Sequence, residues 1–164
     1  LFMFGNMGMN FFDMALARCR QFDGERFNYT RKKTEREGDH FSIKQSEECL
    51  KILQYYMNGK EPNDYIFPLL TLDTPKERIH RVKEAKASWF NKRMKNITAE
   101  LKIAKNVTTY TARDTWTNLG LRMGIDITKI SSSLGHSSVQ VTEKHYKQAL
   151  SFQILDMVNA QITA

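Results

Sequence analysis

Apolar and polar positions divide the first quarter of the chain into segments with different periods. Over residues 1–17 the apolar side chains recur with helical spacing and predict a helix. Residues 26–31 alternate with a period of two, which predicts a half-buried strand, and residues 40–44 form a second candidate strand. The segment 32–39 between them is polar and contains a glycine. This pattern predicts an antiparallel β-hairpin with its tip at 32–39.

Helical signals dominate the rest of the chain. Ser46 is the expected N-cap of one helix, and Thr74, followed by Pro75, is the expected N-cap of another. Gly124 and Gly135 stand where left-handed residues end helices. We expect helices at 46–57, 75–102, 110–123, 126–133, 138–146 and 148–160. The predicted fold class is therefore mostly α (α+β), with a small antiparallel hairpin near the N-terminus.

The composition is that of one globular domain. The chain has 164 residues, of which 41% are hydrophobic and 26% are charged. Cys19 and Cys49 have neither metal-site spacing nor a disulfide framework around them, which suits a reducing, cytoplasmic environment. No apolar run approaches the roughly 18 residues of a membrane span. The chain opens at Leu1, inside an apolar segment, and we expect it to be one domain of a longer protein.

Positive charge is concentrated in two windows. The net charge is +7, residues 18–36 hold seven Lys/Arg against three acids, and residues 76–105 hold ten against three. Such clusters favour a phosphate backbone, here double-stranded DNA, although a solvated basic helix face has the same pattern. We expect DNA to lie across the face built by residues 26–36 and 76–105. The candidate contacts are Arg31, Lys32, Arg36, Arg78, Arg81, Lys92, Arg93 and Lys95.

Motif searches exclude several classes of site. The sequence has no HExxH, no Cys/His pair at metal-ligand spacing, no P-loop and no GxSxG elbow, so we expect neither a metal nor a cofactor. What remains is a dispersed set of groups suited to binding a phosphate. They are Lys33 in the hairpin, Arg113, His136 and Tyr146.

Ordered motifs in the second half of the chain resemble the C-terminal signature of tyrosine recombinases, the site-specific integrases of phages and conjugative elements. They are TTYTARDTW at 108–116, LGHSS at 134–138 and TEKHY at 142–146. The resemblance is strongest to the Bacteroidetes-type branch and spans nearly the whole chain. Three further motifs carry it, at 8–14, 33–34 and 65–68.

The resemblance implies a reaction and a role for each residue. Tyr146 would attack a DNA phosphodiester and form a 3′-phosphotyrosine, without ATP and without a metal. Arg113 would clamp the phosphate with its planar fork, and His136 would donate to the same phosphate. Lys33 would protonate the leaving 5′-oxygen. The Gly135 turn would then aim His136 at the phosphate that Tyr146 attacks.

One departure from the family pattern concerns charge. Asn10 stands where the family has its first arginine, and an asparagine donates a hydrogen bond but brings no charge. Losing one donor to the transition state can cost on the order of 10²–10³ in rate. Arg18 or Arg20 could supply the missing charge.

Other departures surround the second arginine and the nucleophile. Tyr110 occupies a position that is often histidine, and it can donate through its hydroxyl. Asp114 replaces a histidine beside Arg113 and would lower the local positive potential. Ten residues separate His136 from Tyr146, where nine is the commoner spacing, and His145 holds that commoner position.

Two other function classes fit parts of the sequence. In a DNA-binding module without catalysis, residues 127–142 would form a small helix-turn-helix, Tyr146 would be structural and Asn10 would mark lost catalysis. In a protein-interaction module, the apolar stripe of 148–160 would dock on a partner, although a helix completing its own core has the same stripe.

The interpretation that accounts for most of these motifs is an integrase catalytic domain. It covers residues 1–164, lacks the N-terminal DNA-binding domains, and serves the integration or excision of a mobile element. Its tail at 148–164 would dock on a neighbouring subunit. The expected assembly is a monomer alone and a homotetramer on DNA.

Overall fold

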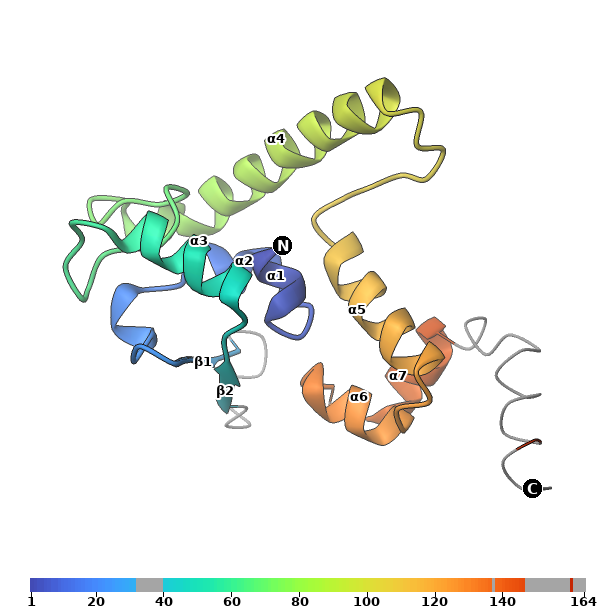
Figure 1. The fold of residues 1–164 in the computed structure, drawn as a ribbon. Helices are drawn as coiled ribbons and strands as arrows, with labels where there is room; N and C mark the ends of the chain where they lie inside the picture. Colours follow the sequence, from blue (N-terminus) through green and yellow to red (C-terminus); the bar gives the residue numbers. More distant parts are fainter. Residues whose placement is uncertain (32–39, 137, 147–159, 161–164) are drawn as a thin grey trace.

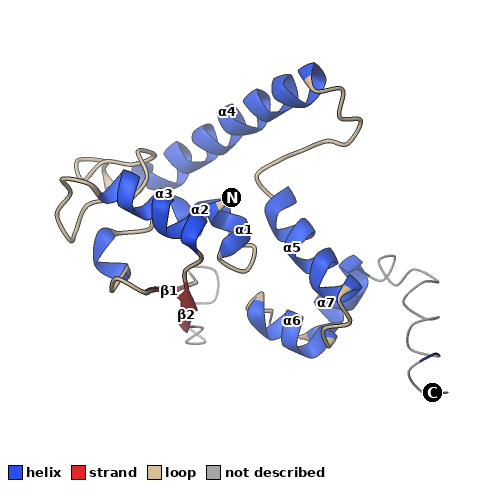
Figure 2. Cartoon of the chain, in the orientation of Figure 1, coloured by secondary structure: helices blue, strands red, loops and turns tan. Residues whose placement is uncertain are grey.

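The computed structural model describes residues 1–31, 40–136, 138–146 and 160. The chain is mostly helical, with one two-stranded antiparallel sheet (Figures 1 and 2). The elements are α1 (Phe2–Gly5), α2 (Phe11–Ala15), β1 (Arg26–Thr30), β2 (His40–Lys44), α3 (Glu47–Met57), α4 (Ile79–Glu100), α5 (Thr111–Arg122), α6 (Ile127–Ser133) and α7 (Val139–Tyr146), with 3-10 turns at Cys19–Gln21 and Lys76–Arg78. The predicted fold class is confirmed.

The predicted hairpin forms, with β1 and β2 paired antiparallel. Phe27 pairs with Ile43 and Tyr29 with Phe41, so the alternation of β1 buries Phe27 and Tyr29 on one face. Tyr29 stacks on Phe41, with ring centroids 5.2 Å apart. The hairpin tip at 32–39, with Lys32, Lys33 and Arg36, lies outside the described residues, as does the tail helix predicted at 148–160.

The single helix predicted over residues 1–17 is wrong. The chain turns between α1 and α2, where Met7 and Gly8 both have positive φ, of 55° and 64°. Asn10 then caps α2, since its side-chain oxygen accepts a hydrogen bond from the Phe12 N–H at 2.8 Å. The break is caused by packing, because Gly8 lies against the backbone of Arg113.

The capping predictions have mixed outcomes. Ser46 caps α3 as expected, and Gly124 and Gly135 adopt left-handed conformations after α5 and α6. Thr74 is not a helix cap. Its hydroxyl turns back to the hydroxyl and N–H of Thr71, each at 3.1 Å, and the following 3-10 turn begins after Pro75 without a side-chain cap.

Two separate apolar clusters hold the described residues together. One lies among α1, the hairpin, α3 and the segment at 66–67, with Phe27, Leu53 and Ile66 fully buried. The other joins α5, α6 and α7 around Ile130 and Leu134. Figure 1 shows α4 extending away from the first cluster, while α5–α7 form a compact group beside α1. No helix among the described residues is long and apolar enough to cross a bilayer.

Candidate functional site

Arg113 lies in the interior, where α5 meets the turn after α1. Its side chain is 3% exposed. Nε donates to the Gly8 carbonyl at 3.0 Å and Nη1 donates to the Leu134 carbonyl at 3.2 Å. Burial lowers the pKa of Arg113 from its usual value, and the charge of Arg31 lowers it further. The guanidinium is therefore held rigidly by backbone carbonyls in a position that Gly8 leaves open.

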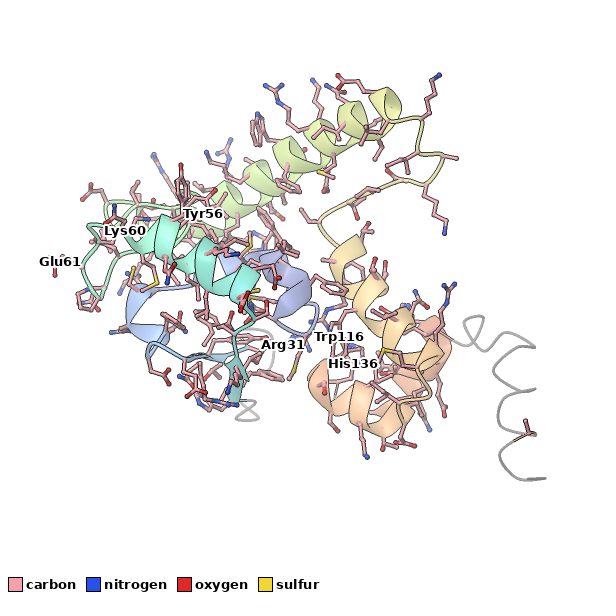
Figure 3. All side chains as sticks on the ribbon, in the orientation of Figure 1. Arg31, Tyr56, Lys60, Glu61, Trp116 and His136 are labelled. Atoms are coloured by element: carbon pink, nitrogen blue, oxygen red, sulfur yellow. The ribbon has the colours of Figure 1, made fainter. Side chains whose placement is uncertain are left out.

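Arg31, predicted as a surface contact for DNA, lies inside this site. It follows β1 and is 8% exposed. Its Nη1 donates to the carbonyls of Leu134 and Gly135, both at 2.6 Å. Figure 3 shows Arg31, which follows β1, and His136, which precedes α7, in the same region between the two parts of the chain. The sequence did not predict this buried position, because Arg31 stands beside other basic residues and such clusters usually lie on the surface.

His136 stands at the end of the Gly135 turn, as the sequence indicated. Its Nε2 lies 3.5 Å from Arg113 Nη1, and its Nδ1 lies 2.8 Å from the hydroxyl of Thr142. Thr142 is fully buried on α7, four residues before Tyr146, so one face of α7 carries both side chains. Thr142 was not predicted, although this i,i+4 spacing was a signal that could have found it.

Tyr146 ends α7 and its side chain is 7% exposed. Its hydroxyl donates to Asp114 Oδ1 at 2.8 Å. Burial raises the pKa of Tyr146 above its usual value, and the hydrogen bond to Asp114 adds to this because it stabilises the protonated phenol. The hydroxyl is therefore a neutral hydrogen-bond donor at neutral pH.

Tyr110 lies between two hollows of the surface. A small pocket of about 190 Å³ is lined by Asn10, Tyr110 and Arg113, so the structure brings these three predicted residues together. An open groove of about 790 Å³ on the other side is lined by Tyr110, Asp114 and Tyr146. Arg113 and the Tyr146 hydroxyl thus face different hollows in this conformation.

The two arginines suggested as substitutes for a charge at Asn10 are engaged elsewhere. Arg18 donates to the Asn63 carbonyl and to the Tyr65 hydroxyl, and its guanidinium lies over the Tyr65 ring. Arg20 donates to the Asn63 side chain at 3.0 Å. Both are thereby tied to the segment at 63–65.

The basic residues predicted on α4 and in the turn before it are on the surface. Arg78, Arg81, Lys92, Arg93 and Lys95 are all exposed. Lys92 and Lys95 line an open groove of about 630 Å³ together with Lys105 from the segment that follows α4. Lys83 from the same basic window is buried instead, with its ammonium 5.0 Å from the centre of the Phe12 ring. The groove therefore carries the positive charge of three lysines, which suits a phosphate backbone.

The site as a whole is suited to an anion. Two guanidinium groups and one imidazole converge on the Leu134–Gly135 turn. Within the described residues neither arginine has a carboxylate at salt-bridge distance, and no group of three or more His, Cys, Asp or Glu side chains could hold a metal ion. Fixed donors of this kind stabilise negative charge that develops on a bound phosphate.

Removing the Thr142 hydroxyl is expected to slow the chemistry of this site. Thr142→Val keeps the shape of the side chain but removes the hydroxyl that contacts His136 Nδ1, so the ring loses one of the contacts that orient it. We expect a loss of about 1 kcal/mol in stability and of roughly tenfold or more in the rate of any phosphate transfer at this site, because the ring is no longer held in place. Quenched time-course assays measure the rate, and thermal unfolding measures the stability. Thr142→Ser, which keeps the hydroxyl, should restore the rate; an unchanged rate in Thr142→Val would contradict the positioning role.

Comparisons with known proteins give a family and a fold. The family model described as "Phage integrase family" matches residues 12–151. Among solved structures, the chain is similar to "Crystal structure of XerA recombinase", with a TM-score of 0.61 and 22% sequence identity over 89% of this chain. The match covers 55% of that recombinase chain, so the protein described here spans about half its length. No curated protein sequence matches the chain significantly.

Proposed function

Because the chain belongs to the phage integrase family, we propose that it is the catalytic domain of a site-specific DNA recombinase that uses Tyr146 as its nucleophile. The observation that carries the proposal is the cluster of Arg113, Arg31 and His136 around one backbone turn, within the same helical group as Tyr146. A cluster of fixed cations and donors is what metal-free phosphoryl transfer needs.

The proposed step exchanges one phosphate ester for another. The Tyr146 oxygen forms a bond to phosphorus while the bond from phosphorus to the 5′-oxygen breaks. The phenol proton of Tyr146 passes to water, and Lys33, which lies outside the described residues, supplies a proton to the leaving oxygen. Arg113 and His136 stabilise the charge on the non-bridging oxygens. Attack by a 5′-hydroxyl reverses the step, so no ATP is consumed.

The hydrogen bond from Tyr146 to Asp114 defines a resting position for the nucleophile. Because Tyr146 and Arg113 line different hollows in this conformation, the hydroxyl has to leave Asp114 and move toward Arg113 before it can attack a phosphate held there. The Tyr110 side chain, which lines both hollows, borders the path between them. Binding of DNA along the Lys92 and Lys95 groove would bring the phosphate that replaces Asp114 as the partner of Tyr146.

The wider role extends the same proposal. The protein would integrate or excise a mobile element of the Bacteroidetes type, as a homotetramer on two DNA duplexes and as part of a longer chain. The tail at 148–164 would dock on a neighbouring subunit. The motifs at 8–14, 33–34 and 65–68 support the branch, and the partial coverage of the XerA chain is consistent with further domains.

A trapping experiment tests the function. A nicked suicide substrate carrying the end of the mobile element is incubated with wild-type protein and with Tyr146→Phe, with and without a chelator, and the products are run on a denaturing gel. We expect a covalent protein–DNA band that requires Tyr146 and resists the chelator. Tyr55→Phe, which changes an exposed tyrosine, is the matched control and should form the band.

The main alternative is a domain of the same fold that binds DNA without cutting it. It is favoured by Asn10, which brings no charge and whose side-chain oxygen is already engaged in capping α2. If wild-type protein binds the element's DNA and forms no covalent band, this alternative replaces the recombinase.

A further inference from the structure

We propose that Arg31 is a further catalytic residue, whose guanidinium contacts the scissile phosphate beside Arg113 and provides the positive charge that Asn10 lacks. This inference rests on the function proposed above. It changes the assignment of Arg31 from a contact with the DNA surface to a contact with the reacting group.

The first support is the direction in which Arg31 is anchored. Nη1 is fixed by the Leu134 and Gly135 carbonyls, directly before His136 in the chain. Its Nε is buried and is the one buried side-chain nitrogen or oxygen in the described residues without a hydrogen-bond partner. A buried donor without a partner is rare in folded proteins and costs free energy. An anion in the site would accept from this N–H.

The second support is the proximity of Arg113. Both Nη1 atoms donate to the same oxygen, that of Leu134, so the two guanidinium groups lie within a few ångströms of each other. Like charges in a poorly solvated site repel strongly unless a counter-charge is present. The charge of Asp13 raises the pKa of the nearby Tyr29, while the charges of Arg31 and Arg113 lower it. Within the described residues no carboxylate forms an ion pair with either arginine.

The third support is the position of Asn10, which stands where the family has its first arginine and lies beside this pair. Asn10 and Arg113 line the same small pocket, and the Asn10 oxygen already accepts the hydrogen bond that caps α2. Arg18 and Arg20 are held by Asn63 and Tyr65. Arg31 is therefore the basic side chain of the described residues that the fold presents to Arg113.

A purely structural role for Arg31 must be separated from a catalytic one, because its Nη1 also bridges the two parts of the chain. Arg31→Gln keeps an amide donor for the turn carbonyls and removes the charge. Arg31→Lys keeps a charge and removes the fork. Arg20→Gln makes the same change at an exposed arginine outside the site and is the matched control.

The experiment measures the rate of the Tyr146 adduct on two substrates. One has an ordinary scissile phosphate, and the other has a methylphosphonate, which lacks one negative charge. On the phosphate, Arg31→Gln should lower the rate by about 10²–10³. On the methylphosphonate the deficit relative to wild type should shrink to within about tenfold, because there is less charge to stabilise. Arg31→Lys should fall between wild type and Arg31→Gln, and Arg20→Gln should match wild type on both substrates.

An equal deficit on both substrates would overturn the proposal and leave Arg31 a structural bridge. If wild-type protein makes no adduct, the proposed function fails, and a second measurement still decides on Arg31. Inorganic phosphate is titrated against wild type, Arg31→Gln and Arg20→Gln at constant ionic strength, with thermal unfolding as the readout. We expect phosphate affinity to fall at least tenfold in Arg31→Gln alone. Equal affinity in all three proteins would also overturn the proposal.

Discussion

Arg113→Gln is expected to lower the rate of Tyr146 adduct formation by about 10²–10³. The guanidinium is held by the Gly8 and Leu134 carbonyls with its plane fixed, so it needs no reorganisation as charge develops on the phosphate. Glutamine can still donate to one of these carbonyls but has no charge and no second donor for a phosphate oxygen. Single-turnover kinetics on the suicide substrate measure the loss.

Arg113→Lys separates charge from geometry in the same assay. Lysine keeps the positive charge, but its ammonium cannot reach both carbonyls and the phosphate with the spacing of a planar fork. We expect it to remain well below wild type. DNA binding measured by gel shift should change little in either variant, since the exposed basic residues of α4 are intact. A rate within tenfold of wild type in Arg113→Gln would remove Arg113 from the catalytic set.

Gly8→Ala is expected to damage both stability and activity. Gly8 has a φ of 64°, and a Cβ there would lie 2.7 Å from the Arg113 Cα, a backbone atom that cannot rotate away. The left-handed conformation costs an alanine roughly 1–2 kcal/mol, and the clash adds roughly 1–3 kcal/mol. For a chain of this length we expect the melting temperature to fall by roughly 4–20 °C. Differential scanning calorimetry measures the fall.

The same substitution should slow adduct formation at temperatures where the variant is folded. Displacing Arg113 by about 1 Å can cost on the order of 10² in rate. Gly59→Ala is the matched control, because Gly59 has a φ of 70° but open space around it. It should lose a few degrees of stability and no activity. If the two variants lose stability equally and both stay active, the close approach to Arg113 does not position the site.

Local sequence signals predicted the elements whose causes are local. The alternation of β1, the Ser46 cap and the left-handed glycines at 124 and 135 depend on neighbours in the chain. The break at Met7 and Gly8 depends on Arg113, more than a hundred residues later, and could not be predicted from periodicity. Thr74 had the signature of a cap, but a turn with Thr71 competed for its hydroxyl.

The candidate site divides in the same way. Motif order predicted Arg113, His136 and Tyr146 as site residues, and the structure brings Arg113 and His136 into contact while Tyr146 lines a neighbouring hollow. Their roles stay predictions until the adduct is measured. The hydrogen bond of Tyr146 to Asp114 and the buried position of Arg31 depend on contacts across helices and across the two clusters. Such contacts leave no periodic signal in the sequence. Arg31 was therefore predicted to lie on the basic surface with its neighbours.

The two arginines link the two apolar clusters in opposite directions. Arg113 reaches from α5 to the turn after α1, and Arg31 reaches from the hairpin to the turn after α6, so each cluster is tied to the other through a charged seam. An anion that contacts both arginines binds best when the two clusters are in contact. Its binding free energy therefore stabilises that contact. Under the proposed function, DNA therefore completes the tertiary structure of the protein that cuts it. The contact between the two apolar clusters is then stronger in the DNA complex than in the free protein.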